Sequence, residues 1–270
     1  MNAWRTSLTS ARLIAWGVAV ALSVSVAAGA EYRRLPGGRF VSTLALDDSA
    51  APVMLPAFAM RSTPVTVADF LRFVQTHPAW RRDRVPSLYA ASGYLQGWRT
   101  SLDPGLASVL QSPVTQVSWF AARAYCQSES ARLPTWHEWE YAAASDHEQA
   151  DARGKQGRSG LILQRLLERT GQTPTPVGRR APDFYGLYDM NSLVWEWVGD
   201  YAALFVNADA RNPDRQNLLQ LCGGSALAFS DRSAYPLMMR VAALSAMQPA
   251  DVSGNIGFRC VRDIQKETNR

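Results

Sequence analysis

Two carboxylates in one aromatic-rich stretch are the first residues of this sequence whose types and spacing indicate chemistry. Asp189 and Glu196 lie in residues 186–200, which also contain a tyrosine and two tryptophans. Large aromatic side chains favour burial, whereas carboxylates need water, hydrogen-bond donors or a metal ion. We therefore expect a buried turn in which the two carboxylates either accept backbone hydrogen bonds or bind a hard cation such as calcium.

The thiols of the chain are Cys126, Cys222 and Cys260. In an oxidising compartment two of them are expected to pair, which leaves one thiol for metal binding or redox chemistry. The sequence alone allows three choices of pair. The three histidines lack the spacing of a metal site, and no G-x-S-x-G motif supports nucleophilic hydrolysis.

Residues 1–30 are predicted to be a signal peptide. Arg5 and Arg12 precede an uncharged apolar run, and residues 28–30 read A-G-A, the small-x-small form that a signal peptidase accepts. The run is short and rich in alanine for a membrane span, so we predict cleavage and a periplasmic or secreted protein. The alternative is an uncleaved N-terminal segment that anchors the protein to a membrane.

Residues 31–270 are long enough for one large domain or two small ones. Without Arg5 and Arg12, the 28 basic residues fall to 26 against 23 acidic ones, so the formal net charge falls from +5 to +3. No run of basic residues is interleaved with aromatic residues, which argues against nucleic-acid binding. The remaining partner classes are proteins, peptides and small molecules.

Three helices are expected to position these residues. Capping patterns predict two that begin after Thr66 and Thr135. A third is predicted to begin at Ser118, where Trp119, Ala122 and Cys126 share one face, and a short apolar stripe predicts another helix at 161–167. Residues 79–113 have no sustained period and are predicted to form a long irregular loop packed by its own aromatic side chains. The pattern is typical of a single α+β domain with few long elements.

The strands are expected near the two ends of the domain. Residues 32–42 read as a turn at Pro36-Gly37-Gly38 followed by a short strand, and residues 53–60, with a proline within them, read as an edge strand. In the C-terminal third, glycine-containing turns alternate with short apolar runs at 237–243 and 256–261.

Several segments, in this order, resemble the formylglycine-generating enzyme (sulfatase-modifying factor) family. The most specific are R-L-P-T-x-x-E-W-E-Y-A-A at 132–143 and V-W-E-W at 194–197. Further matches are P-V-x-x-V-S-W at 113–119, A-Y-C at 124–126, P-V-G at 176–178, G-L-Y-D-M at 186–190, G-G-S at 223–225 and G-F-R-C at 257–260. The resemblance implies the compact, loop-rich α+β fold of that family, which is distantly similar to C-type lectin domains.

The resemblance also predicts a missing activity. Authentic formylglycine generators bind copper(I) between two cysteines shortly after the Gly-Gly-Ser segment and convert a substrate cysteine to formylglycine. A linear copper(I) site needs at least two soft thiolates. Ala228 and Ser233 stand about where that pair would be, so oxidase activity of the authentic type is not expected.

A disulfide between Cys126 and Cys260 is implied by the same resemblance, and it leaves Cys222 as the odd thiol. Cys222 is then the candidate catalytic residue, because methionines follow it within residues 238–247 and a thiolate with thioethers can bind copper(I). The alternative is that Cys222 is a small buried hydrophobic residue and the methionines fill gaps in the core.

By resemblance, a calcium site would use the side chains of Asp189 and Glu196 with the carbonyl groups of Ser192 and Val194. Calcium takes six or more oxygens, which these groups and water can supply. The Gly-Asn that the family has before V-W-E-W is Ser-Leu here, and the predicted helix at 161–167 replaces the loop of a second calcium site. Backbone hydrogen bonds to both carboxylates remain the alternative.

These observations leave three functions open. The first is an exported accessory protein that matures, or handles metal for, a partner protein; the residues after Cys222 look most like the branch encoded beside copper nitrite reductases. The second is a non-catalytic module that binds a peptide or glycan in a groove lined by Trp98, Trp195 and Tyr235. The third is a divergent metal-dependent oxidase of a small molecule or peptide, distinguished from the first by substrate turnover.

Overall fold

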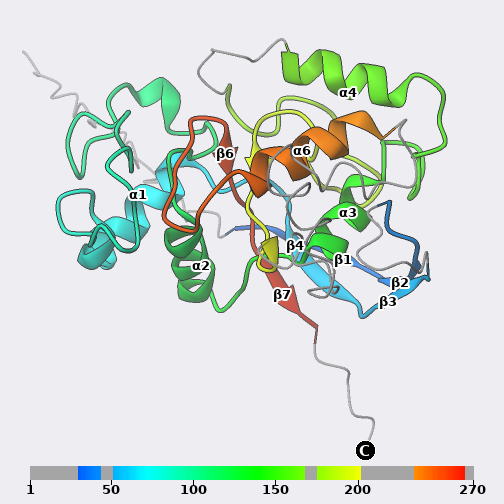
Figure 1. The fold of residues 1–270 in the computed structure, drawn as a ribbon, viewed down its shortest axis with the longest axis horizontal. Helices are drawn as coiled ribbons and strands as arrows, with labels where there is room; N and C mark the ends of the chain where they lie inside the picture. Colours follow the sequence, from blue (N-terminus) through cyan, green and yellow to red (C-terminus); the bar gives the residue numbers. More distant parts are fainter. Residues whose placement is uncertain (1–29, 44–50, 168–174, 202–233, 265–270) are drawn as a thin grey trace, which may run out of the picture.

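The computed structural model describes residues 30–43, 51–167, 175–201 and 234–264 (Figure 1). Its strands are β1 (Tyr32–Leu35), β2 (Gly38–Phe40), β3 (Val53–Leu55), β4 (Phe58–Arg61), β5 (Trp195–Glu196), β6 (Ile256–Gly257) and β7 (Val261–Asp263). Its helices are α1 (Val67–Thr76), α2 (Trp119–Ser128), α3 (Trp136–Ala143), α4 (Arg158–Leu167) and α6 (Tyr235–Ser245), with 3₁₀ turns at Pro78–Trp80 and Ala107–Val109. The predicted mixture of helices and strands joined by long loops is confirmed.

A three-stranded antiparallel sheet brings the two ends of the described chain together. Strand β4 lies in the centre, with β1 on one side and β7 on the other. Side chains along each strand point alternately to the two faces of the sheet, and Leu35, Phe58 and Met60 are fully buried. This is expected for a sheet with one face against the core. Figure 1 shows α1 and α2 together at one end of the molecule and α3, α4 and α6 at the other.

The edge strand predicted at 53–60 is wrong in its position. The segment forms two strands, β3 and β4, and β4 is the central strand of the sheet. Proline prevents a central strand only where its missing N–H is needed, and Pro52 and Pro56 both lie outside the strands. The turn before β2 is as predicted: Gly37 has a φ of +68°, and a Cβ there would lie 2.4 Å from the Leu55 carbonyl oxygen.

The three predicted helix starts are confirmed by their caps. Thr66 and Thr135 each form a capping box, in which the threonine side chain accepts from the third helical residue and that residue's carboxylate accepts from the threonine N–H. Ser118 caps α2 by accepting from the Ala121 N–H. These side chains satisfy N–H groups that have no partner inside the helix.

Replacing Thr135 by alanine is expected to lower the free energy of unfolding by about 1 kcal/mol, because the Glu138 N–H loses its acceptor at 3.2 Å. Urea unfolding measures the change. Thr76→Ala is the matched control: Thr76 lies in the last turn of α1, where its hydroxyl donates to the Arg72 and Phe73 carbonyl groups and caps no helix. Equal losses in the two variants would contradict the role of the cap.

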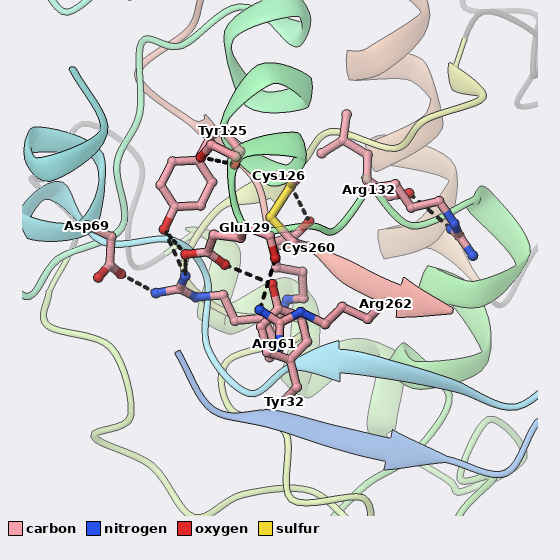
Figure 2. The surroundings of a disulfide bond; sticks show 12 residues. Tyr32, Arg61, Asp69, Tyr125, Cys126, Glu129, Arg132, Cys260 and Arg262 are labelled. Carbon is pink, nitrogen blue, oxygen red and sulfur yellow. Dashed lines mark hydrogen bonds and ion pairs between the residues drawn. A yellow bond between two sulfur atoms is a disulfide. The ribbon is translucent and has the colours of Figure 1, made fainter. Parts of the chain in front are cut away.

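The disulfide implied by the resemblance is present. Cys126 in α2 and Cys260 just before β7 are joined in the core, with a Cα–Cα distance of 5.5 Å (Figure 2). Both residues are fully buried. The bond ties the second helix to the strand at the C-terminal end of the described chain.

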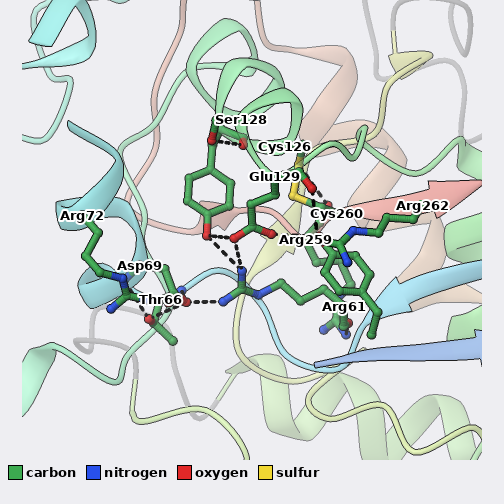
Figure 3. Close-up of polar contacts among 12 residues, drawn as sticks. Arg61, Thr66, Asp69, Arg72, Cys126, Ser128, Glu129, Arg259, Cys260 and Arg262 are labelled. Atoms are coloured by element: carbon green, nitrogen blue, oxygen red, sulfur yellow. Dashed lines mark hydrogen bonds and ion pairs between the residues drawn. A yellow bond between two sulfur atoms is a disulfide. The ribbon is translucent and has the colours of Figure 1, made fainter. Parts of the chain in front are cut away.

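A partly buried ion network lies beside this disulfide (Figure 3). Arg61 pairs with Asp69 of α1 and, at 3.0 Å, with Glu129 at the end of α2. Glu129 also accepts from the hydroxyl groups of Tyr32 and Tyr125. The network therefore joins β1, β4, α1 and α2, so polar contacts as well as core packing hold the sheet to these helices.

Candidate functional site

The centre of the candidate site is the Glu196 carboxylate in β5, which is fully buried. Arg259 donates from Nε to both carboxylate oxygens, at 3.0 and 2.9 Å, and from Nη2 to Oε1 at 2.9 Å. The indole Nε1 of Trp139 in α3 donates to Oε2 at 2.7 Å. A buried charge is tolerated when it is paired and hydrogen-bonded in this way.

A second arginine, Arg240 of α6, contacts both Trp139 and the backbone of Glu196. Its guanidinium carbon lies 3.5 Å from the centroid of the Trp139 ring, and Nη2 donates to the backbone carbonyl of Glu196. Arg240 is fully buried, and this burial lowers the pKa of its guanidinium to about 9. Its Nε and Nη1 have no hydrogen-bond acceptor within the described residues.

Another buried carboxylate, Glu140 of α3, lies near this group. It accepts from Trp136 Nε1 at 3.0 Å and from the Thr43 N–H at 2.6 Å. Trp139 of the R-L-P-T-x-x-E-W-E-Y-A-A motif and Trp136, at its first variable position, thus donate their indole N–H groups to two acidic residues, Glu196 and Glu140. Each buried indole N–H and each buried carboxylate needs a partner, and these two pairs satisfy both needs.

Asp189 is held separately from Glu196. It is half-buried and has a φ of +62°. Its Oδ2 accepts from the Gly178 N–H at 2.7 Å, and its Oδ1 lies 3.5 Å from the Ser192 hydroxyl. Asp189 thus accepts a backbone hydrogen bond, as the first of the two expected arrangements has it, whereas the donors to Glu196 are the side chains of Arg259 and Trp139.

The geometry does not fit the implied calcium site as arranged. Calcium needs oxygen ligands that point at one position, but both oxygens of Glu196 face cationic or indole donors. An ion at Glu196 would have to displace Arg259. Within the described ranges, no group of three or more His, Cys, Asp or Glu residues could hold a metal ion. Ser192 and Val194 are buried in the same turn, and calcium at these residues stays an untested prediction.

The three aromatic residues of the expected groove have different environments. Trp98 is only 7% exposed and packs edge to face on Phe70 in the core, so its ring does not fit a groove wall. Trp195 is half-buried in β5, whereas Tyr235 is 51% exposed at the start of α6. None of the ring contacts among the described residues joins two of these three side chains, and their shared groove stays a prediction.

Other expected site residues lie outside the described residues. These are the candidate catalytic residue Cys222, the G-G-S segment at 223–225, and Ala228 and Ser233 at the positions expected for a copper-binding pair. The predicted signal peptide also lies outside them, apart from Ala30. None of the helices in the described ranges has the length and apolar composition needed to cross a membrane.

Sequence reasoning missed the arginines of the site. Arg259 belongs to the G-F-R-C match, yet nothing local shows that it pairs with a carboxylate 63 residues earlier. Arg240 follows two methionines in an apolar run, and an arginine in such a run was the one available signal of a buried, paired charge.

Comparison with known proteins gives consistent matches over most of the chain. Residues 22–264 match the sulfatase-modifying factor enzyme 1-like domain. The inactive C-alpha-formylglycine-generating enzyme 2 of Mus musculus is 30% identical over 84% of this chain and 83% of its own. The formylglycine-generating enzyme of Mycobacterium tuberculosis is 29% identical over 85% of this chain and 96% of its own.

Two solved structures resemble the fold at lower identity. The crystal structure of CarF aligns with 87% of this chain and 99% of its own, with a TM-score of 0.45 and 19% identity. The structure of PvdO from Pseudomonas aeruginosa aligns with 86% of this chain and 93% of its own, with a TM-score of 0.46 and 17% identity.

Proposed function

The chain belongs to the sulfatase-modifying factor enzyme 1-like family, and from that premise we propose that it is an accessory protein that binds a partner protein or peptide. In this proposal it does not use the two-cysteine copper chemistry of authentic formylglycine generators. The observation that carries the proposal is the disulfide between Cys126 and Cys260, which takes two of the three cysteines. Because one thiol remains, a single chain cannot supply two thiolates for copper(I).

The relatives support this division within the family. One protein that matches over most of both chains is named inactive, while others of similar identity are named formylglycine-generating enzymes. Overall identity therefore does not separate the two groups. For this chain, the number of free thiols decides whether two copper ligands exist.

The remaining parts of the proposal rest on the sequence patterns described above. The protein is exported after removal of residues 1–30, and it matures or handles metal for its partner. A copper nitrite reductase is the partner that the residues after Cys222 favour. The buried layer around Glu196 supports a scaffolding role, since its charges are used to hold β5, α3 and α6 together and do not face a substrate.

A peptide-oxidation assay tests the missing chemistry. The mature chain, supplied with copper(I) and oxygen, is expected to convert none of a cysteine-containing sulfatase-type peptide to formylglycine, measured by mass spectrometry. The Mycobacterium tuberculosis enzyme is the positive control. Turnover by this chain that Cys222→Ser abolishes would contradict the proposal and favour a divergent oxidase.

Metal analysis of the purified mature protein separates the remaining roles. Stoichiometric copper that is lost in the Cys222→Ser variant would support metal handling centred on Cys222. Calcium alone, unchanged in that variant, would indicate a structural ion at Asp189 and would favour a pure binding module. Neither metal would leave partner binding as the whole of the role.

A further inference from the structure

A cavity of about 580 Å³ lies between α4 and residues 180–192. Helix α4, at the edge of the molecule beside α6 (Figure 1), contributes one face to it. That face consists of Arg158, Leu161, Ile162 and Arg165. Their spacing of three, four and seven residues places these side chains on the same side of the helix. Two apolar residues are therefore presented to the cavity with an arginine at each end.

The floor of the cavity is apolar and belongs to the core. Leu187 and Met190, which line it, are 1% and 6% exposed. Leu161, on the α4 side, is 48% exposed. A cavity of this size with apolar walls and a few polar groups is typical of a ligand site, and it is large enough for several side chains.

The carboxylates that line the cavity already have partners. Asp183 accepts from the Ser145 hydroxyl and from the N–H groups of Tyr185 and Leu187, all within 2.9 Å. Asp189 accepts from the Gly178 N–H. Asp146, the third carboxylate of the lining, pairs with Lys155 at 3.0 Å. These groups therefore hold the walls in place and are not free to bind a cation.

Two of the lining cations have no such compensation. The Nη2 of Arg158 donates to the carbonyl groups of Ala143 and Ser145, at 2.6 and 2.9 Å. Neither Arg158 nor the exposed Arg180 has a carboxylate within ion-pair distance in the part of the chain that the structure describes. Both line the cavity, and Asp146, Asp151 and Asp183 act on Arg158 only from beyond ion-pair distance. The cavity therefore presents two guanidinium groups that have no direct ion-pair partner among the described residues.

We propose that this cavity binds an acidic peptide segment of the partner protein. This proposal rests on the partner-binding role above. In it, an apolar side chain of the peptide contacts Leu187 and Met190 at the floor of the cavity, and the carboxylates of the peptide pair with Arg158 and Arg180. Arginine pairs with carboxylates through two parallel hydrogen bonds. The apolar floor and the three carboxylates of the lining disfavour a nucleic acid, whose phosphates need a continuous basic surface.

Fluorescence anisotropy with a defined probe tests the site. The probe is a fluorescein-labelled acetyl-Asp-Leu-Glu-Leu-Asp amide, and its control replaces the acids by Asn and Gln. The full mature chain is expected to bind the acidic probe at least about tenfold more tightly than the control, and less tightly as salt increases. No binding of the acidic probe, or equal binding of both peptides, would overturn the proposal.

Arg179 offers a matched control for Arg180. The two residues are adjacent and both exposed, but only Arg180 lines the cavity. Arg180→Glu is expected to weaken binding of the acidic probe by about tenfold and Arg179→Glu by less than about threefold, since the second change acts only at a distance. Equal effects would indicate general charge attraction and would overturn the site.

Two further measurements complete the test. Leu161→Asp, at the rim of the cavity, is expected to weaken binding of the acidic probe without changing thermal unfolding. Unchanged binding would contradict the role of α4 as a wall of the site.

A short single-stranded DNA that bound as tightly as the acidic probe, with the same difference between the Arg180 and Arg179 variants, would overturn the peptide assignment. The peptide-oxidation assay does not involve this cavity. If the acidic probe does not bind, the peptide site is rejected and the accessory role stands. If formylglycine forms in the oxidation assay, the accessory role is rejected and the peptide site stands.

Discussion

The Glu196→Gln variant is expected to lose about 3–5 kcal/mol of unfolding free energy, because it breaks a buried ion pair and leaves Arg259 without a counter-charge. Both side chains of the pair are fully buried. Glutamine has almost the same shape, so the change creates no cavity. The glutamine NH2 group, however, replaces an acceptor oxygen with a donor, so it faces the N–H donors of Arg259 or Trp139 and cannot bond to them. Urea unfolding at neutral pH measures the difference.

Asp263→Asn is the matched control for that prediction. Asp263 also pairs with an arginine, Arg132, but its side chain is 71% exposed, and exposed pairs contribute about 0–1 kcal/mol. A second comparison uses Arg259→Met alone and with Glu196→Gln. The double variant should be less destabilised than the sum of the single variants, since no lone buried charge remains. Equal losses for Glu196→Gln and Asp263→Asn would refute the importance of burial.

The helix starts could be read from the sequence because their signals are local. A capping box involves residues only three positions apart, and Thr66 and Thr135 form it whatever the rest of the chain does. The aromatic loop at 79–113 was also predictable in kind: Tyr94 donates to the Trp80 carbonyl at 3.0 Å within it. The disulfide came from the family resemblance, since three cysteines allow three pairs.

Elements that depend on distant partners were missed. Strand β1 reads Y-R-R-L, with two arginines that no strand pattern favours, and it exists because each of its residues pairs with β4. Helix α6 was read as a short apolar run, because burial on several sides removes the polar stripe that marks a surface helix. In both cases tertiary contacts, not local preference, decide the structure.

The candidate site shows the same limit more sharply. A carboxylate among tryptophans was a sound signal of burial, and Glu196 is indeed buried. What satisfies it could not be read, because Arg259 and Arg240 come from distant segments. Calcium and arginine both satisfy a buried carboxylate, so residue types alone left the choice open. The structure gives arginine as the partner.

Removing the disulfide is the other change with a large expected effect. The bond joins residues separated by 134 positions, and for a loop of this length the chain-entropy relation gives about 5 kcal/mol of stabilisation through the unfolded state. We therefore expect the Cys126→Ala, Cys260→Ala double variant to lose about 4–5 kcal/mol of unfolding free energy in urea. The wild type should lose a similar amount when a reductant is added to the unfolding series.

Cys222 makes this experiment specific to one pairing. If Cys126 and Cys260 form the bond, the Cys222→Ser variant should respond to reductant as the wild type does, and the double alanine variant should not respond at all. If Cys222 were paired instead, its loss would remove the response to reductant and would release a free thiol in the core. That outcome would reject the disulfide in Figure 2, and it would make Cys126 or Cys260, in place of Cys222, the remaining free thiol.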